Sequence, residues 1–89
     1  MTVKVEVFYS PYCLHCPTAM KIVRDVCSGF RDIEIEEVNC LEDEGMQRAI
    51  KYRISFVPTI VINGKTKLIG ILNENDLSKT IEDELKIRR

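Results

Sequence analysis

The sequence predicts one α/β domain, in which a four-stranded mixed sheet is flanked by three helices. Segments of strand and helix periodicity alternate in the order strand, helix, strand, helix, strand, strand, helix. The first three form a strand–helix–strand unit, whose crossover should be right-handed and whose strands should be parallel. An Asn63-Gly64 pair between two apolar segments predicts an antiparallel hairpin. With 89 residues, the chain is expected to form a single domain over 1–89.

The elements of the first half follow from the spacing of apolar residues. Residues 3–9 alternate with a period of two, which predicts a strand. A helix is expected from about Cys13 to Ser28, because apolar residues then recur at helical spacing and Gly29 can end it. Alternation over 33–38 predicts the second strand. The acidic stretch 41–44 suits the start of the next helix, which carries on one side the apolar residues Met46, Ala49 and Ile50.

The second half predicts a hairpin followed by a helix. The apolar segment Phe56 to Ile62 is typical of a buried strand entered through a proline. Its antiparallel partner is expected over Lys67 to Leu72. Asn73 or Asn75 can cap the final helix, whose acidic residues come early, as the helix dipole favours. That helix should turn inward Leu77, Ile81 and Leu85, with Lys86, Arg88 and Arg89 in its last turns.

Composition excludes several classes of protein. Thirteen basic and fourteen acidic residues give a net charge of −1 and are interspersed, so we expect no nucleic-acid partner. No segment approaches the roughly 20 apolar residues that span a bilayer, and no basic leader precedes an apolar core. We therefore expect a cytoplasmic protein without a membrane partner.

Cysteine spacing points to the chemistry. Cys13 and Cys16 form a C-x-x-C motif where the first strand passes into the first helix. A thiolate at a helix N-terminus is stabilised by free N–H groups, so we expect Cys13 to ionise below the usual pKa of about 8.5. In a reducing cytosol such spacing favours either redox chemistry or metal binding.

The other two cysteines are expected outside this site. Cys27 lies eleven residues beyond Cys16, about 16 Å along the same helix, and follows the apolar face. We expect it to be a buried structural thiol. Cys40 closes the second strand at the same edge of the sheet as Cys13. A core position is favoured for it, with a regulatory or second resolving thiol as the alternatives.

These features resemble the thioredoxin and glutaredoxin superfamily over nearly the whole chain. The resemblance is carried by Cys13-Leu14-His15-Cys16, by Val57-Pro58-Thr59 before the third strand, and by the Asn63-Gly64-Lys65 turn. The run from Cys13 to Ala19 is similar to that of small archaeal thioredoxin-like or glutaredoxin-like proteins. The resemblance implies a thioredoxin-like fold and a thiol-disulfide oxidoreductase that needs no cofactor or metal beyond the redox-active disulfide.

The resemblance also implies roles for individual residues. Cys13 would attack a partner disulfide, and Cys16 would resolve the mixed disulfide. Pro58 would be cis beside the dithiol, the backbone of Val57 would pair with the substrate chain, and Thr59 would follow at the rim.

The residues around the dithiol suggest two further roles. His15 lies between the cysteines, where a cation would favour the thiolate and make the disulfide more oxidising; a solvated histidine with little effect is the alternative. Tyr12 and Pro11 form an expected apolar shoulder suited to a protein substrate. The implied partners are disulfide-bearing proteins and a thioredoxin-reductase-like or other electron donor, and a monomer is expected.

The chain departs from the family pattern in two places. Thioredoxins carry a buried acid six residues before the first cysteine, where this chain has Val7. Glu37 could partly substitute, although a surface glutamate is the more ordinary interpretation. Glutaredoxins place a lysine before the site and a Gly-Gly pair followed by Asp before the last helix. Here only Gly70 and Asp76 remain of that pattern, which weakens glutathione binding.

Three other functions therefore remain as alternatives. The first is glutathione-linked glutaredoxin activity. The second is a metal or iron-sulfur cluster held between subunits by Cys13 and Cys16. The third is a non-catalytic adaptor, which is weak because binding alone requires no dithiol.

Overall fold

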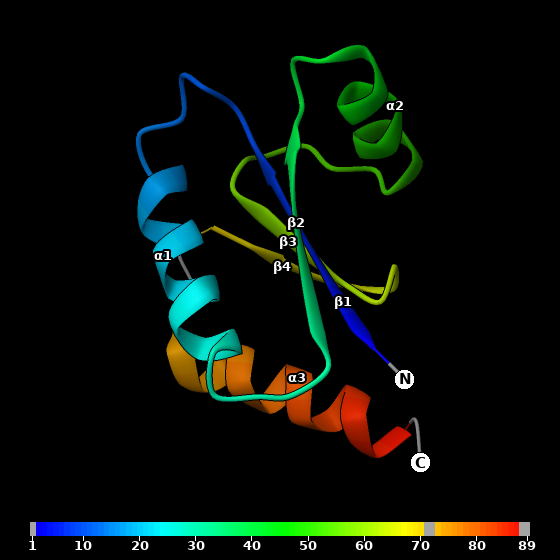
Figure 1. Ribbon diagram of the computed structural model, residues 1–89. Helices are drawn as coiled ribbons and strands as arrows, with labels where there is room; N and C mark the ends of the chain where they lie inside the picture. Colours follow the sequence, from blue (N-terminus) through cyan, green and yellow to red (C-terminus); the bar gives the residue numbers. More distant parts are fainter. Residues whose placement is uncertain (1, 71–72, 88–89) are drawn as a thin grey trace.

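The elements follow one another in the predicted order along the described part of the chain, residues 2–70 and 73–87 of a computed structural model (Figure 1). The strands and helices are β1 (Val3–Tyr9), α1 (Cys16–Cys27), β2 (Ile33–Asn39), α2 (Asp43–Lys51), β3 (Thr59–Ile62), β4 (Thr66–Ile69) and α3 (Glu74–Ile87).

The four strands form one mixed sheet in the order β2-β1-β3-β4. β1 and β2 are parallel, in a register that pairs Val7 with Glu37 and Tyr9 with Asn39. β3 runs antiparallel to both β1 and β4. The predicted α/β class and mixed sheet are thus confirmed. Because β1 and β2 are parallel, the segments that follow them leave the sheet at the same edge.

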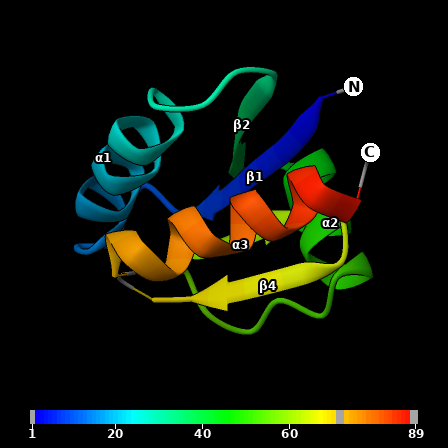
Figure 2. The ribbon, with the colours of Figure 1, turned by 90° about the horizontal axis from the view of Figure 1, so that it is seen from below.

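Helices cover both faces of the sheet (Figures 1 and 2). Alternate β1 residues pack against α1 and α3 on one face, in a core that includes Val5, Val23 and Ile81. The opposite face is covered by α2, through a smaller core made of Phe8, Val38, Ala49 and Val61. Because both faces of β1 are buried, its alternate side chains pack against α1 and α3 on one face and against α2 on the other.

The first helix begins later than predicted. α1 starts at Cys16, and His15 is its N-cap, so Cys13 lies three residues before the helix. Between β1 and α1 the chain makes a turn in which the Cys13 amide donates to the Ser10 carbonyl at 3.1 Å. Pro17 accounts for the start, because proline has no N–H and fits only the first helical turn.

The boundaries of the third strand and the faces of α2 also differ from prediction. β3 begins at Thr59, and Phe56 is 68% exposed, because the segment containing Pro58 cannot join the ladder. Of the three apolar residues on α2, only Ala49 is buried, whereas Met46 and Ile50 are exposed. The helix meets the sheet instead through its smallest residues, Gly45 and Ala49.

The C-terminal strand is shorter than predicted, and the final helix turns the expected residues inward. β4 pairs with β3 from Thr66 to Ile69 and ends before Gly70, so the expected strand over Lys67 to Leu72 is wrong at Gly70; Leu72 lies outside the described residues, as do Arg88 and Arg89. Asn73 is the residue that caps α3, since its side-chain oxygen accepts the Asn75 amide at 2.7 Å. Leu77 and Ile81 are fully buried, and Leu85 packs beside them.

Candidate functional site

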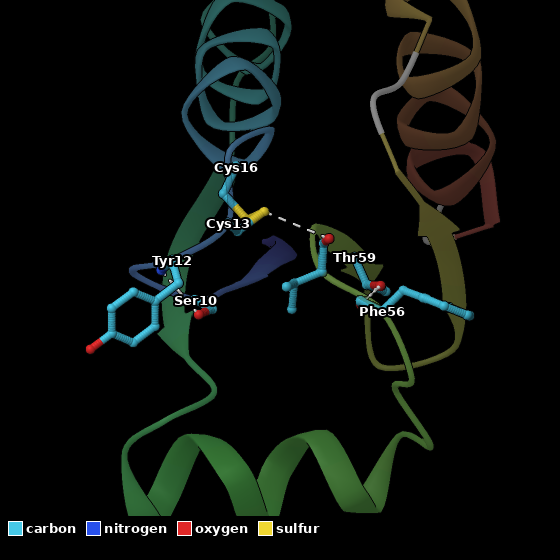
Figure 3. Close-up of a disulfide and its surroundings, with 7 residues drawn as sticks. Ser10, Tyr12, Cys13, Cys16, Phe56 and Thr59 are labelled. Atoms are coloured by element: carbon cyan, nitrogen blue, oxygen red, sulfur yellow. Dashed lines mark hydrogen bonds between the residues drawn. A yellow bond between two sulfur atoms is a disulfide. The ribbon is translucent and has the colours of Figure 1, made fainter.

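The two cysteines of the C-x-x-C motif form a disulfide beyond the end of β1, with a Cα–Cα distance of 5.4 Å. The preceding turn is held by Ser10, whose carbonyl accepts the Cys13 amide and whose hydroxyl accepts the Tyr12 amide at 3.2 Å. Figure 3 shows the disulfide at the start of α1, with the ring of Tyr12 directed away from it. The Cys13 sulfur therefore belongs to the turn, whereas the Cys16 sulfur belongs to the first residue of α1.

The two sulfurs differ in burial. Cys16 is 3% exposed as the first residue of α1, and Cys13 is partly exposed in the turn before it. Contrary to the predicted helix boundary, Cys13 is not within the helix, but it precedes the N-terminus, where free backbone N–H groups remain. A partner sulfur can reach Cys13 more readily than Cys16.

A second loop lies against the disulfide. The Val57 carbonyl oxygen is 3.6 Å from the Cys13 sulfur, although the two residues are 44 positions apart (Figure 3). The peptide bond between Val57 and Pro58 is cis, and Pro58 is buried. This loop brings backbone polar groups next to the Cys13 sulfur.

Thr59 lies inside the fold, whereas the sequence had predicted a place at the rim of the site. It is 1% exposed, and its hydroxyl donates to the Phe56 carbonyl at 2.6 Å. A buried hydroxyl with an internal partner contributes by fixing the loop, because it is shielded from a docking chain.

Large apolar side chains are exposed on the two segments that contain the disulfide and Val57. Tyr12 is 84% exposed, as expected, and Pro11 beside it is also exposed. Leu14 and Phe56 are 90% and 68% exposed, and sequence reasoning had not assigned either of them to the site. A leucine between two cysteines of a turn was a usable signal, because a turn leaves its side chains outside the core. His15 is exposed between the cysteines, and its side chain makes no capping hydrogen bond.

A cavity of about 330 Å³ opens beside the disulfide, between α1 and the ends of β1 and β2. Its lining includes both cysteines together with Tyr9, Ser10, Pro11, Pro17, Met20, Arg24 and Glu37. The Arg24 guanidinium and the Glu37 carboxylate form an ion pair there. Val7, the β1 partner of Glu37, is 1% exposed and contributes no polar atom.

The remaining cysteines are free thiols, and neither lines the cavity beside the disulfide. Cys27 is 6% exposed in the larger core, and burial raises the pKa of its thiol to about 11. The expected burial of Cys27 is confirmed. Cys40 packs partly buried against the smaller core, and burial also raises its pKa. Within residues 2–70 and 73–87, no three side chains of His, Cys, Asp or Glu gather in a way that could hold a metal ion.

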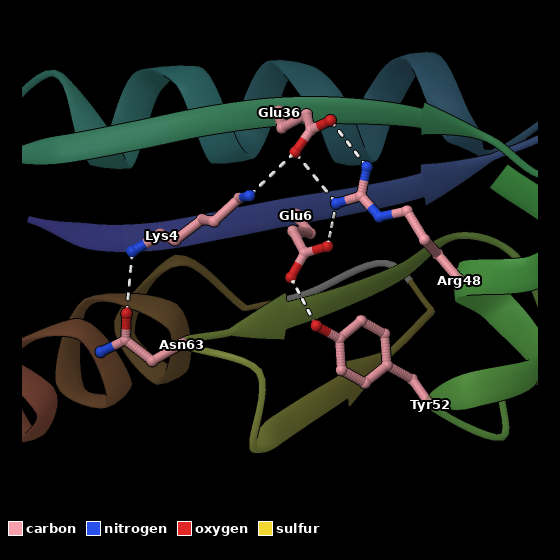
Figure 4. Close-up of polar contacts among 6 residues, drawn as sticks. All are labelled: Lys4, Glu6, Glu36, Arg48, Tyr52 and Asn63. Carbon is pink, nitrogen blue, oxygen red and sulfur yellow. Dashed lines mark hydrogen bonds and ion pairs between the residues drawn. The ribbon is translucent and has the colours of Figure 1, made fainter. Parts of the chain in front are cut away.

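A buried polar network on the α2 face was not anticipated (Figure 4). Glu6, on the central strand β1, is 2% exposed; the Arg48 guanidinium pairs with it, and Tyr52 donates to it at 3.1 Å. Arg48 also donates to Glu36 at 2.7 Å, and Lys4 pairs with Glu36 at 3.2 Å. Hydrogen bonds from Arg48, and then from Lys4, lower the pKa of Glu36 to about 2. The alternation of β1 placed Glu6 and Lys4 on one face, but not their partners on α2.

None of the described helices combines the length and apolar character needed to cross a bilayer.

Comparisons with known proteins agree with this geometry. The family model for the thioredoxin domain matches residues 1–82. The chain is 42% identical over 84 residues to a thioredoxin of Methanocaldococcus jannaschii, which covers 93% of this chain and 96% of the relative. It is 37% identical over 87 residues to a probable thioredoxin of Methanothermobacter marburgensis, which covers 97% and 100%.

Solved structures show the same fold. Mitochondrial thioredoxin 3 of Saccharomyces cerevisiae superposes with a TM-score of 0.76 at 24% identity, covering 91% of this chain and 77% of that one. A mutant thioredoxin of Halobacterium salinarum gives 0.76 at 24% identity, covering 91% and 73%. The fold, the disulfide and the sequence relatives lead to one conclusion: this chain belongs to the thioredoxin family and is a thiol-disulfide oxidoreductase.

Proposed function

We propose that this protein reduces disulfides of other proteins, with Cys13 as the attacking thiolate and Cys16 as the resolving thiol. The observation that carries the proposal is the asymmetry of the disulfide, which joins a partly exposed sulfur to a buried one. An exposed thiol before a helix N-terminus ionises and meets a large partner. A buried thiol next to it is protected from the same partner until the mixed disulfide forms.

The exchange proceeds in two displacements. The Cys13 thiolate attacks one sulfur of the substrate disulfide, so that a mixed disulfide forms and the other substrate sulfur leaves as a thiolate. Cys16, once it has lost its proton, then attacks the Cys13 sulfur. The bond between Cys13 and the substrate breaks, the internal disulfide forms, and the second substrate thiolate leaves. The substrate gains two electrons and the dithiol loses them.

The substrate chain would lie along the loop beside the disulfide. The Val57 carbonyl already faces Cys13 at 3.6 Å, and an extended peptide can pair with such backbone groups as an added strand. Pro58 and Thr59 hold this loop, Pro58 as a buried residue and Thr59 through its bond to Phe56. The exposed rings of Tyr12 and Phe56 would contact apolar side chains of the substrate.

The proposal includes the supply of electrons. A reductase of the thioredoxin-reductase type would return the dithiol to its reduced form, and the cycle would run in the cytoplasm with the protein as a monomer. The redox potential tests the direction of electron transfer. It is measured by equilibrating the protein in buffers of known redox potential and counting free thiols by mass. A potential near −270 mV fits a reductant, whereas one near −200 mV or above would contradict the reducing role.

Single-cysteine variants test the residue assignment. Cys13→Ser should abolish reduction of a protein disulfide, because the attacking sulfur is gone. Cys16→Ser should accumulate the mixed disulfide with substrate, visible as a reducible adduct by mass. A Cys13→Ser protein that still forms such an adduct through Cys16 would reverse the assignment.

The glutathione-linked alternative is disfavoured, because the sequence relatives are thioredoxins and the lysine and second glycine of the glutathione pattern are missing. Turnover that required glutathione as the electron donor would restore it. Metal content of protein purified under reductant tests the alternative of a cluster shared between subunits.

A further inference from the structure

The resolving thiol has to lose a proton in a buried place. Cys16 is 3% exposed, and desolvation disfavours a thiolate there. The second displacement therefore needs a group that takes the proton from Cys16, and that group must reach it from the cavity beside the disulfide.

Glu37 is the one carboxylate among the described residues that line this cavity with both cysteines. It lies on β2, in register with Val7 of β1, so its side chain shares the α1 face of the sheet with the neighbours of Cys16. Arg24 of α1 pairs with the carboxylate at the cavity wall, where the two side chains are 60% and 39% exposed. A carboxylate in that position can accept a proton through cavity water.

Polar and charged groups from several elements lie around Glu37. Tyr9 from β1 and Arg24 from α1 line the cavity with it. On its other side Glu37 borders a hollow of about 140 Å³, whose charged lining residues are Glu36 of β2, Glu42, and Glu44 and Arg48 of α2. His15 is exposed between the cysteines. Arg24 is the only cation that the cavity lining contributes among the described residues, and it is the one paired with Glu37.

We propose that Glu37 accepts the proton of Cys16 through cavity water during the second displacement, with Arg24 as the positioning residue. The proton passes from the Cys16 sulfur to water and from water to the carboxylate. The sulfur then attacks Cys13, the bond from Cys13 to the substrate breaks, and the proton returns to the departing substrate thiolate or to solvent. This role rests on the proposed function of Cys13 and Cys16.

The two displacements can be separated with an aromatic disulfide that releases a coloured thiolate at each step. Reduced protein releases one equivalent when Cys13 attacks and a second when Cys16 resolves. The leaving thiolate is weakly basic and needs no proton, so the second rate reports deprotonation of Cys16. If the wild-type protein shows no first phase, the proposed function is wrong. If a variant without the Glu37 carboxylate shows a normal first phase and an unaltered second phase, only the role of Glu37 is wrong.

In stopped-flow experiments near neutral pH, Glu37→Gln should slow the second phase by about tenfold and leave the first within about twofold. The deficit should shrink as pH rises, because the thiol then ionises without help. Added formate or imidazole should restore part of the lost rate.

Matched variants separate this role from a structural one. Glu34→Gln removes an exposed carboxylate of the same strand and should leave both phases unchanged. Glu37→Asp keeps the carboxylate and should retain more of the second-phase rate than Glu37→Gln. Arg24→Gln removes the ion pair but not the base. If Arg24→Gln and Glu37→Gln slow the second phase equally, with no change in its pH profile and no rescue, the pair serves only to hold α1 on β2 and the proposal is wrong.

Discussion

The two sulfurs of the dithiol have different neighbours, and these neighbours suit each sulfur to a different step of the proposed reaction. Cys13 is partly exposed and faces the Val57 carbonyl, whereas Cys16 is buried and faces the cavity that contains Glu37. The sequence indicated which cysteine is more exposed, since Cys13 comes first and Cys16 lies one turn on. It did not indicate what each sulfur contacts, because those neighbours come from segments distant along the chain.

Replacement of His15 by alanine tests whether a side chain between the cysteines tunes the potential. A cation at this position would favour the thiolate of the reduced form, so removal of the imidazole should make the disulfide harder to reduce. Because His15 is exposed and water screens it, we expect the potential to fall by no more than about 30 mV. Titration in redox buffers measures the shift, with Lys21→Ala on exposed α1 surface as the control. A rise in potential would show that the sign of the interaction is wrong.

Cys27 should resist alkylation in the folded protein. Burial raises the pKa of its thiol from 9.0 to about 11, so nearly all of it is protonated at neutral pH, and it is 6% exposed. With excess iodoacetamide at neutral pH, mass mapping should find reduced Cys13 modified first and Cys27 unmodified until the protein is unfolded. Modification of Cys27 at the rate of Cys13 would mean that this part of the core opens readily.

At the scale of elements, α2 is held to the sheet by partly buried charges as well as by apolar contact. Arg48 reaches from α2 to Glu6 on β1 and to Glu36 on β2, and its guanidinium lies 5.9 Å from the Phe8 ring centroid. The raised pKa of Arg48 reflects first its bond to Glu36. A buried carboxylate such as Glu6 is tolerated only because it is paired in this way.

This network predicts acid sensitivity. The pKa of Glu36 is lowered from 4.5 to about 2 in the folded protein, so its contribution to stability is fully present above about pH 4.5. The contribution is lost as pH falls toward 2. Since the Glu36 side chain is 39% exposed, water screens the pair and we expect about 1 kcal/mol in total.

Denaturant unfolding at a series of pH values measures this term. Glu36→Gln should lower stability at pH 7 by about that amount and flatten the dependence between pH 5 and 2. Glu34→Gln is the control, because Glu34 is exposed on the same strand. Equal pH profiles for the wild type and Glu36→Gln would show that the pair contributes nothing to folding.

Close approach of α2 to the end of β2 depends on Gly45. A Cβ atom added there would lie 1.9 Å from the Asn39 carbonyl oxygen, so the helix would have to move. We expect Gly45→Ala to lower the free energy of unfolding by about 3 kcal/mol. At Gly29 an added Cβ would meet its nearest atom at 3.5 Å, so Gly29→Ala should be nearly neutral in the same denaturation experiment. A Gly45→Ala protein as stable as Gly29→Ala would mean that α2 shifts freely.

The whole molecule has two cores of different size on opposite faces of one sheet. The core under α1 and α3 contains buried residues of β1, β3 and both helices, whereas the hydrophobic core under α2 has four buried residues within the described part of the chain. The disulfide lies at the start of α1, a helix of the larger core. The loop that contains Val57 follows α2, the helix of the smaller core. The reactive sulfur therefore lies where the two layers meet, beyond the ends of β1 and β2.

The difference between the cores predicts a difference in local stability. Native-state hydrogen exchange should show α2 amides opening at a lower free energy than those of β1, α1 and α3, because α2 buries less apolar surface. Gly45→Ala should increase this difference in opening free energy, because it weakens the packing of α2 further. Protection of α2 equal to that of β1 would indicate that the molecule opens only as one cooperative unit.

Most of the fold could be predicted from the sequence, since it depends on local periodicity. The alternation of β1, the hairpin pair Asn63-Gly64 and the inward residues Leu77 and Ile81 all act over a few positions. Two of the boundaries that were wrong lie near the site and are set by prolines. Pro17 delays the start of α1, and Pro58 delays the start of β3.

The sequence by itself determined the order of the elements, the α/β class and the pair of cysteines that form the disulfide, because each depends on residues close together along the chain. Only the tertiary structure decided that Val57 faces Cys13, that Thr59 is buried, and that Glu37 and Arg24 line a cavity with both cysteines. Those contacts depend on strand register and on helix packing, which no local pattern specifies.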